Sequence, residues 1–376
     1  MDVTVTAKIQ LIPSDEDAES LIDTSHIYTK ACNYVSDYIF RTHNLKQYSI
    51  NEALYYDLRQ LFGLKSQMAQ SVIKTVLARY RTIRSNRNKR IKPSFHAYEY
   101  DLVWNRDYAF MKDETFSVNS VNGRLHVGFH KNGMEHFFDG TWKFGTAKLV
   151  HKHGKLFLHI PMTKEFDALT DTDVNNVVGI DRGIRFLTAC YDSNGKTVFC
   201  SGAQVKQKRA HYKELRTELQ KKQTSSARKR LRLIGQRENR WMRDINHCIS
   251  KALVESNPKG TLFVLEDLSN VRKATERVRR KDRYVSVSWS YFDLEQKLMY
   301  KAQMHGQKMI KVNPAYTSQT CPKCGHVHKG NRDKSRHIFK CLKCGYQTND
   351  DRIGAMNLYR MGIEYLAEAQ SSISVL

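Results

Sequence analysis

Two Cys-x-x-Cys motifs are the sequence feature that most constrains the fold of this chain. CPKC spans Cys321–Cys324 and CLKC spans Cys341–Cys344; each motif is followed by a glycine, and sixteen residues separate them. Four thiolates at this spacing suit the tetrahedral coordination of a structural Zn²⁺ ion. A disulfide pair or a redox motif is the alternative interpretation. We therefore predict a zinc ribbon at 319–348, with Cys321, Cys324, Cys341 and Cys344 as ligands.

Basic residues are concentrated in three runs of the sequence. The 376 residues include 62 Lys and Arg against 38 Asp and Glu, a formal charge of +24 at pH 7. Residues 71–93 contain eight Lys and Arg and no acid, 206–243 contain fourteen against three acids, and 272–283 contain seven against two. A polyanion would relieve the resulting repulsion, so nucleic acid is the expected partner, although any single run could be a solvated helix face. The residues expected to contact nucleic acid are Lys74, Arg79, Arg81, Arg84, Arg228, Lys229, Arg230, Arg232 and Arg240.

The apolar content predicts folded domains outside a membrane. Hydrophobic residues make up 40% of the chain, enough for sizeable cores in two or three domains. No segment approaches the roughly 18 consecutive apolar residues of a membrane span, and the first residues lack the apolar segment of a signal peptide. We expect a cytoplasmic monomer without a membrane partner, associated with the nucleoid when bound to DNA.

The beginning of the chain combines a strand with helical patterns. Apolar and polar residues alternate from 2 to 12, which is typical of a half-buried strand. Ser14 and Asp17 then resemble a helix-capping box. The predicted helices cover 15–43, 49–62 and 65–86.

Strand patterns return after these helices, with hairpin signals at Asn122-Gly123 and His153-Gly154. The simplest organisation pairs the first strand with these later ones. We predict a β-barrel domain made of 1–12 and 88–170, which carries a helical-bundle insertion at 13–87.

A different order of elements follows in the second half. An apolar strand ends at Asp181, and Asn194-Gly195 is a turn signal between the next two strands. Two long basic helices, a strand ending at Glu266, another helix and a last strand follow. This order predicts an RNase H-like α/β fold, which we place at 174–318 and 349–376, with the zinc ribbon inserted in it.

Three acids in this fold form a predicted catalytic site. The first and fourth strands of an RNase H-like sheet are adjacent and parallel, which brings Asp181 and Glu266 together. Asp351, at the start of the last helix, can approach from a third direction. Such clustered carboxylates suit two Mg²⁺ ions about 4 Å apart, which promote phosphodiester hydrolysis. Each acid alone also has a structural explanation, as a turn residue, a surface strand end or a helix N-cap.

Motifs around these acids resemble those of a known family. GIDRGI surrounds Asp181, LEDLSN surrounds Glu266, and CLKCGYQTNDDRIGAMNL joins the second cysteine pair to Asp351. Over about 177–360 the chain closely resembles the TnpB (OrfB) family of insertion sequences, which are relatives of type V CRISPR effectors. The resemblance implies a RuvC-like nuclease domain, an N-terminal wedge domain with a helical recognition domain, and a zinc ribbon.

The resemblance also implies a function. It predicts an RNA-guided DNA endonuclease encoded by a transposable element, which uses a guide RNA from the transposon end and cuts double-stranded DNA beside a short adjacent motif. Asp181, Glu266 and Asp351 match the family's catalytic acids, and Arg332 matches an arginine that contacts the scissile phosphate. A cleavage-deficient RNA-guided repressor, or an RNA-independent zinc-ribbon transposase accessory protein, would be the alternative.

Overall fold

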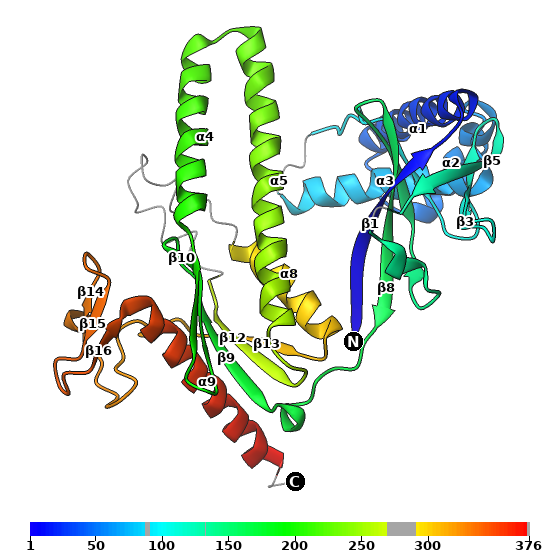
Figure 1. The fold of residues 1–376 in the computed structure, drawn as a ribbon. Helices are drawn as coiled ribbons and strands as arrows, with labels where there is room; N and C mark the ends of the chain where they lie inside the picture. The colour runs from blue at the N-terminus through cyan, green and yellow to red at the C-terminus, as the bar shows by residue number, and fades with distance from the viewer. Residues whose placement is uncertain (87–90, 132, 269–290, 374–376) are drawn as a thin grey trace. The chain divides into compact units, whose positions relative to one another are not determined.

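The chain forms two compact units in this computed structural model (Figure 1). One unit comprises Asp2–Glu165, and the other comprises Met1 and Phe166–Leu376. The structure describes residues 1–376 except 87–90, 132, 269–290 and 374–376, so the basic run at 272–283 lies outside the described residues. Among the helices that it describes, none is long and apolar enough to cross a membrane.

The N-terminal unit contains an eight-stranded, barrel-like sheet in which the strand pairs are antiparallel. Its long strands β1 and β8 lie side by side over most of their length. The last strand of the unit therefore pairs with the first. The main path of the sheet runs β2-β7-β8-β1-β5-β4-β3, and β6 pairs with β8. The strands are β1 (Asp2–Ile12), β2 (Glu99–Leu102), β3 (Tyr108–Phe110), β4 (Phe116–Ser120), β5 (Gly123–His130), β6 (Lys143–Phe144), β7 (Ala147–Lys152) and β8 (Lys155–Glu165).

Three helices lie between β1 and β2 in the chain. They are α1 (Asp15–Thr42), α2 (Gln47–Gln60) and α3 (Ser66–Ser85). The predicted cap is confirmed, since the Ser14 hydroxyl accepts a hydrogen bond from the Asp17 amide at 3.2 Å. Leu21, Tyr28 and Val35 recur every seven residues of α1 and are buried, so one stripe of this amphipathic helix faces the interior.

The C-terminal unit is built on a mixed five-stranded sheet of order β11-β10-β9-β12-β13. Strand β12 runs parallel to both β9 and β13, whereas β10 runs antiparallel to β9 and β11. The predicted parallel pairing of the first and fourth strands is therefore confirmed. The strands are β9 (Asn176–Asp181), β10 (Phe186–Asp192), β11 (Thr197–Ser201), β12 (Thr261–Glu266) and β13 (Lys308–Val312).

Helices cover both faces of this sheet, in agreement with the predicted α/β class (Figure 1). Side chains alternate along β9: Val178 packs in one core with Leu298 of α8 (Tyr291–Met304), while Val177 packs in another with Leu358 of α9 (Asp350–Ile373). Because both faces are covered, β9 and β12 are almost entirely apolar until their last residues, which are acids.

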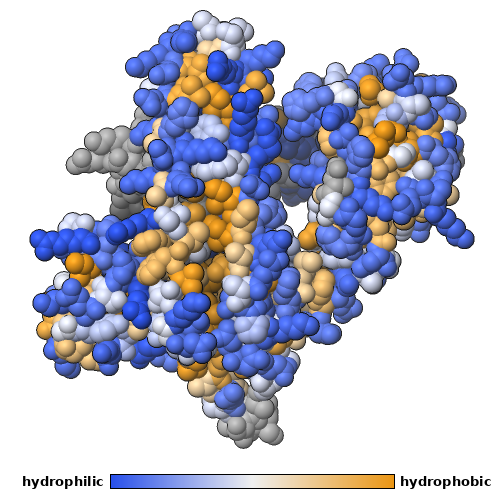
Figure 2. All heavy atoms as spheres, viewed as in Figure 1, coloured by the Kyte–Doolittle hydropathy of each residue, from blue (hydrophilic) through white to orange (hydrophobic). Residues whose placement is uncertain are grey.

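Two long antiparallel helices, α4 (Ala203–Lys222) and α5 (Ser225–Glu255), form a hairpin that extends from this sheet (Figure 1). Apolar side chains gather between the two helices and hydrophilic ones border them (Figure 2). Arg209 and Arg216 both pair with the buried Glu238, which ties the helices together. The hairpin is thus stabilised by its internal core, and the basic side chains on its outer surface are not needed to hold the two helices together.

Candidate active site and metal centres

The four predicted zinc ligands converge. All four Sγ atoms lie within 4.8 Å of one another; Cys321 and Cys344 are 3.6 Å apart, and Cys324 and Cys341 are 3.5 Å apart. Tetrahedral Zn²⁺ with bonds of about 2.3 Å separates its sulfur ligands by about 3.8 Å, so the cluster fits this ion. All four are free thiols rather than disulfide partners.

The glycine after each motif closes a tight turn. Gly325 and Gly345 have φ values of +72° and +71°, a left-handed conformation that favours glycine. Their amides donate to the carbonyls of Cys321 and Cys341, at 2.9 and 3.0 Å. The turns therefore direct both thiols of each motif toward the same point.

The ribbon is joined to the start of α9 by a shared core. Its three strands are β14 (Arg332–Asp333), β15 (Ile338–Lys340) and β16 (Gln347–Asn349). Cys321, Phe339 and Cys341 pack with Ile353 of α9. Asn349, the last residue of β16, accepts hydrogen bonds from the Asp351 and Arg352 amides at 3.0 and 3.3 Å. Asn349 thus satisfies the helix start, which frees the Asp351 side chain from capping.

The three predicted catalytic acids lie at the end of β9, at the end of β12 and at the start of α9. Ile180 pairs with Leu265 in parallel register, so Asp181 and Glu266 end neighbouring strands. Burial and then the nearby Glu266 and Asp351 carboxylates raise the pKa of Asp181 to about 7. This mutual repulsion is the electrostatic character of a site that binds a cation.

Asp351 and Glu266 differ in the partners that hold them. The Thr317 hydroxyl donates to Glu266 Oε1 at 2.5 Å. Asp351 Oδ2 is buried and accepts no hydrogen bond from any residue in the described part of the chain. Burial and Asp350 raise the pKa of Asp351, against the opposing charge of Arg332. An unpartnered buried carboxylate oxygen and hard oxygen donors fit a divalent cation such as Mg²⁺.

A buried arginine that no sequence motif had marked as a site residue connects the strand ends. Arg182 donates to the main-chain carbonyl of Glu266 at 2.5 Å and lies 3.4 Å from the Glu295 carboxylate of α8. Its side chain is 1% exposed. The guanidinium therefore links β9, β12 and α8 at the strand ends that carry Asp181 and Glu266. Its position immediately after Asp181 was the available sequence signal.

Arg332 lies in β14 beside the start of α9. Its Nε is 2.9 Å from Asp350 Oδ2, and its Nη2 is 3.8 Å from Asp351 Oδ1. His337, which follows in the same hairpin, lies near the same acids: its Nδ1 is 3.6 Å from Asp350 Oδ1. Neither Asp350 nor His337 was predicted as a site residue, because only the folded ribbon brings them together.

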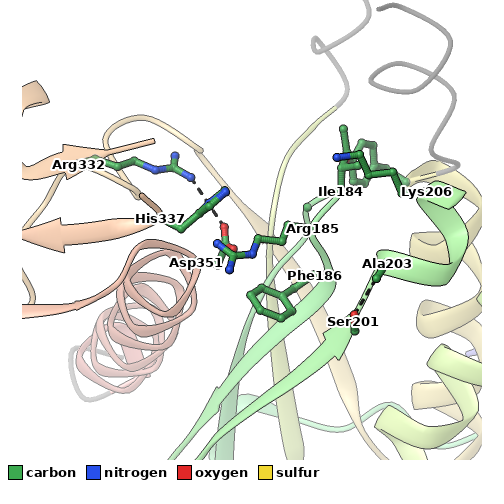
Figure 3. A pocket seen from close by; sticks show the side chains of 12 residues that line it. Ile184, Arg185, Phe186, Ser201, Ala203, Lys206, Arg332, His337 and Asp351 are labelled. Carbon is green, nitrogen blue, oxygen red and sulfur yellow. Dashed lines mark hydrogen bonds and ion pairs between the residues drawn. The ribbon is translucent and has the colours of Figure 1, made fainter. Parts of the chain in front are cut away.

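A pocket of about 840 Å³ opens beside Asp351 (Figure 3). Arg332 and His337 approach Asp351 from the ribbon, while Arg185 approaches it from the loop before β10. Lys206 of α4 also lines the pocket. Positive side chains around an acidic centre suit a phosphate group that approaches bound cations.

The nine predicted nucleic-acid contacts are all exposed and fall on two helices. The four predicted on the first basic run lie on α3, and the five on the second run lie on α5. The structure brings none of them into the pocket beside Asp351.

Two family models match most of the C-terminal unit, and the first of them begins within β8 of the N-terminal unit. A model described as "Probable transposase" (OrfB_IS605) matches 159–278, and one described as "Cas12f1-like, TNB domain" matches 291–358. The second match covers α8, β13, the ribbon and the start of α9, and so includes Asp351.

Curated relatives share this region. The chain is 30% identical over 247 residues to CRISPR-associated endodeoxyribonuclease Cas12f1 of Sulfoacidibacillus thermotolerans, which covers 61% of this chain and 56% of that protein. It is 29% identical over 282 residues to "Putative RNA-guided DNA endonuclease InsQ" of Escherichia coli (strain K12), covering 69% and 67%. The chain thus spans little more than half the length of the Cas12f1 relative.

A solved structure shares the fold over a greater length. A Cas12f1 chain in a cryo-EM structure of a Cas12f1-sgRNA-target DNA complex superposes with a TM-score of 0.61 at 16% identity, covering 93% of this chain and 83% of that one. At this identity the likeness concerns the fold alone. Together with the motifs around the acids and cysteines, these matches show that the chain is similar to the TnpB (OrfB) family, relatives of type V CRISPR effectors, chiefly over its C-terminal unit.

Proposed function

We propose that this protein is an RNA-guided DNA endonuclease encoded by a transposable element. Its substrate is double-stranded DNA that matches a guide RNA from the transposon end and lies next to a short adjacent motif. The names of two relatives, an endodeoxyribonuclease and a putative RNA-guided DNA endonuclease, support this class of activity. The protein acts as a monomer in the cytoplasm, on the nucleoid when DNA is bound.

The approach of Asp181, Glu266 and Asp351 from β9, β12 and α9 is the observation that carries the proposal. A mixed sheet with acids at two adjacent strand ends and on the last helix matches the arrangement expected of an RNase H-like, RuvC-type nuclease domain. Burial and then the nearby Glu266 and Asp351 carboxylates raise the pKa of Asp181, and a cation held among these acids would offset their repulsion. Divalent cations held there supply charge neutralisation and Lewis acidity for phosphodiester hydrolysis.

Different residues of the chain have different roles in the proposed reaction. Asp181, Glu266 and Asp351 would hold two Mg²⁺ ions. Arg332 contacts the scissile phosphate from the ribbon, where it is already oriented by its contact with Asp350. Arg182 keeps the Glu266 strand end in place through its hydrogen bond to the Glu266 carbonyl. Cys321, Cys324, Cys341 and Cys344 would hold the ribbon zinc, and the core that Cys321 and Cys341 share with Ile353 links the ribbon to the start of α9, next to Asp351.

The basic helices α3 and α5 bind nucleic acid through phosphates. Their exposed Lys and Arg contact the backbones of the guide–target duplex, so base pairing rather than side-chain contact selects the sequence. The barrel and the helices α1–α3 act as the wedge and recognition domains that read the adjacent motif.

The test is to purify the protein from cells that carry its native locus and to sequence the RNA that co-purifies. Duplexes that match this RNA, with a randomised flank, are then incubated with the complex and Mg²⁺. Cleavage only of matched duplexes with one enriched flank supports the proposal. No co-purifying RNA, with DNA binding retained, would favour the RNA-independent alternative; RNA-dependent binding without cleavage would favour a repressor.

A further inference from the structure

A second group of ligand atoms lies at the start of α9. One ligand atom from each of His337, Asp350 and Asp351 lies within 4.8 Å of the other two. His337 Nδ1 and Asp350 Oδ1 are 3.6 Å apart. The Asp350 side chain is 1% exposed and that of Asp351 is 15% exposed. The two adjacent carboxylates are therefore largely desolvated, and the imidazole of His337, whose side chain is 38% exposed, lies beside them at the surface.

Three polar atoms of this group have no hydrogen bond. His337 Nδ1, Asp350 Oδ1 and Asp351 Oδ2 are buried and find no hydrogen-bond partner among the described residues. Arg332 contacts the other oxygen of each acid, Asp350 Oδ2 at 2.9 Å and Asp351 Oδ1 at 3.8 Å. A buried polar atom without a partner costs about 1–3 kcal/mol, so a ligand shared by these three atoms would stabilise the group.

The charges of the group suit a divalent cation. Two carboxylates and one guanidinium leave one net negative charge, and a neutral imidazole adds a nitrogen lone pair. Arg185 and Lys206 line the adjoining pocket and oppose a cation there, but they favour a phosphate as the ion's further partner. A nitrogen donor beside carboxylates suits Mn²⁺, Co²⁺ or Zn²⁺ better than Mg²⁺ or Ca²⁺.

The hairpin of the ribbon fixes the histidine in position. Asp333 Oδ1 accepts hydrogen bonds from the Ser335 and Arg336 amides at 2.9 and 3.2 Å, which shapes the turn. His337 follows with φ +55°, and its carbonyl accepts a hydrogen bond from the Asp350 amide at 3.3 Å. The imidazole is thereby held over the start of α9 by the main chain.

We propose that His337, Asp350 and Asp351 bind one divalent transition-metal ion, with the His337 imidazole as its nitrogen ligand. The site shares Asp351 with the proposed nuclease centre and therefore rests on that function for its role, which is to hold an ion against the phosphate of the nucleic acid. It gives the protein a higher affinity for Mn²⁺ than for Mg²⁺.

Manganese binding to the zinc-loaded 376-residue protein tests the site. Free Mn²⁺ is followed by its electron paramagnetic resonance signal, and pulsed measurements detect a histidine nitrogen coupled to the bound ion. We expect that coupling in the wild-type protein. His337→Gly and His337→Asn both tolerate the left-handed turn, and both should lose the coupling. The Kd for Mn²⁺ should rise about tenfold or more in His337→Gly.

Two variants serve as controls. His326→Ala removes another histidine of the same ribbon and should leave the nitrogen coupling unchanged. Asp181→Asn disables the proposed nuclease centre but should also leave the coupling in place. A wild-type protein without nitrogen coupling, or a His337→Gly variant that keeps it, overturns the proposal. Because the measurement needs neither RNA nor cleavage, a failure of the nuclease proposal is recognised separately, by absent cleavage with Mn²⁺ binding intact.

Discussion

Gly354 of α9 lies directly against the carboxylate of Asp181 at the end of β9. A Cβ atom on residue 354 would lie 2.7 Å from Asp181 Oδ2. The same close approach recurs along the helix, since a Cβ on Gly179 would lie 2.1 Å from the Ala355 carbonyl oxygen and one on Gly362 would lie 2.6 Å from Val264 Cγ2. Glycines on both elements thus let α9 approach the sheet closely enough to bring Asp351 toward Asp181.

Gly354→Ala should lower the cleavage rate about 100-fold, because the added methyl group must displace Asp181 or α9 from its position. Alanine is otherwise the better helix residue by about 1 kcal/mol, so a loss of activity cannot come from helix propensity. Single-turnover cleavage of a guide-matched duplex measures the effect.

Gly235→Ala in α5 is the matched control for that prediction. A Cβ there meets only Arg216 Nη2, at 3.8 Å. This variant should cut at the wild-type rate and gain about 0.5–1 kcal/mol in stability. A wild-type rate for Gly354→Ala would show that the close contact does not position the acids.

Asp181 should make the stability of the protein depend on pH when no divalent cation is added. Burial and then Glu266 and Asp351 raise its pKa to about 7 in the folded state, above the ordinary value of 3.8. The folded protein therefore binds this proton more tightly than the unfolded chain. The associated stabilisation is complete below about pH 4 and is lost as the pH rises through about 7.

Urea unfolding at pH 5, 6, 7 and 8 measures that dependence. Asp181→Asn cannot ionise, so the fall in the free energy of unfolding over this range should be smaller than in the wild type. Added Mg²⁺ should reverse the fall in the wild-type free energy of unfolding, because bound cations relieve the repulsion between the carboxylates. Asp181→Asn should also fail to cleave DNA. Asp167→Asn, at an exposed position of the same unit, is the control. Identical pH profiles for wild type and Asp181→Asn would contradict the prediction.

Cys321→Ser should remove zinc and cleavage together. Zinc binding contributes on the order of 10 kcal/mol to the folding of such ribbons, and Cys321 packs with Ile353 at the start of α9. Elemental analysis should find about one zinc ion per chain in the wild type and a large loss in the variant. Cys248→Ser, at an exposed free thiol of α5, should change neither zinc content nor cleavage. Full zinc content in Cys321→Ser would mean that this thiol is not a ligand.

Charge on α5 should set the salt dependence of nucleic-acid binding. Replacing Arg230, Arg232 and Arg240 with glutamine should weaken binding to all sequences alike. The slope of log K against log salt should become shallower by about 0.9 for each lost contact with duplex DNA. The same three positions changed to lysine keep their charge and should keep the slope. Equal slopes for both triple variants would mean that these three side chains do not contact the phosphates.

Features that depend on near neighbours in the chain were predictable. The spacing of Cys321 and Cys324, the capping of α1 by Ser14, and the apolar strands that end at Asp181 and Glu266 all follow from local patterns. The parallel pairing of β9 and β12 followed from the order of the elements, because few connections of strands and helices are physically accessible.

Contacts between distant side chains were not predictable from those patterns. Arg182 and Glu295 are 113 residues apart, and nothing local distinguishes them from surface charges. His337 was one of fifteen histidines until the ribbon hairpin placed it over Asp350. Composition and spacing thus determined which chemistry the chain contains, whereas the packing of α9 and the ribbon on the sheet decided which charged groups lose water and face one another. Desolvation and distance control electrostatic energy, and both exist only in the folded state.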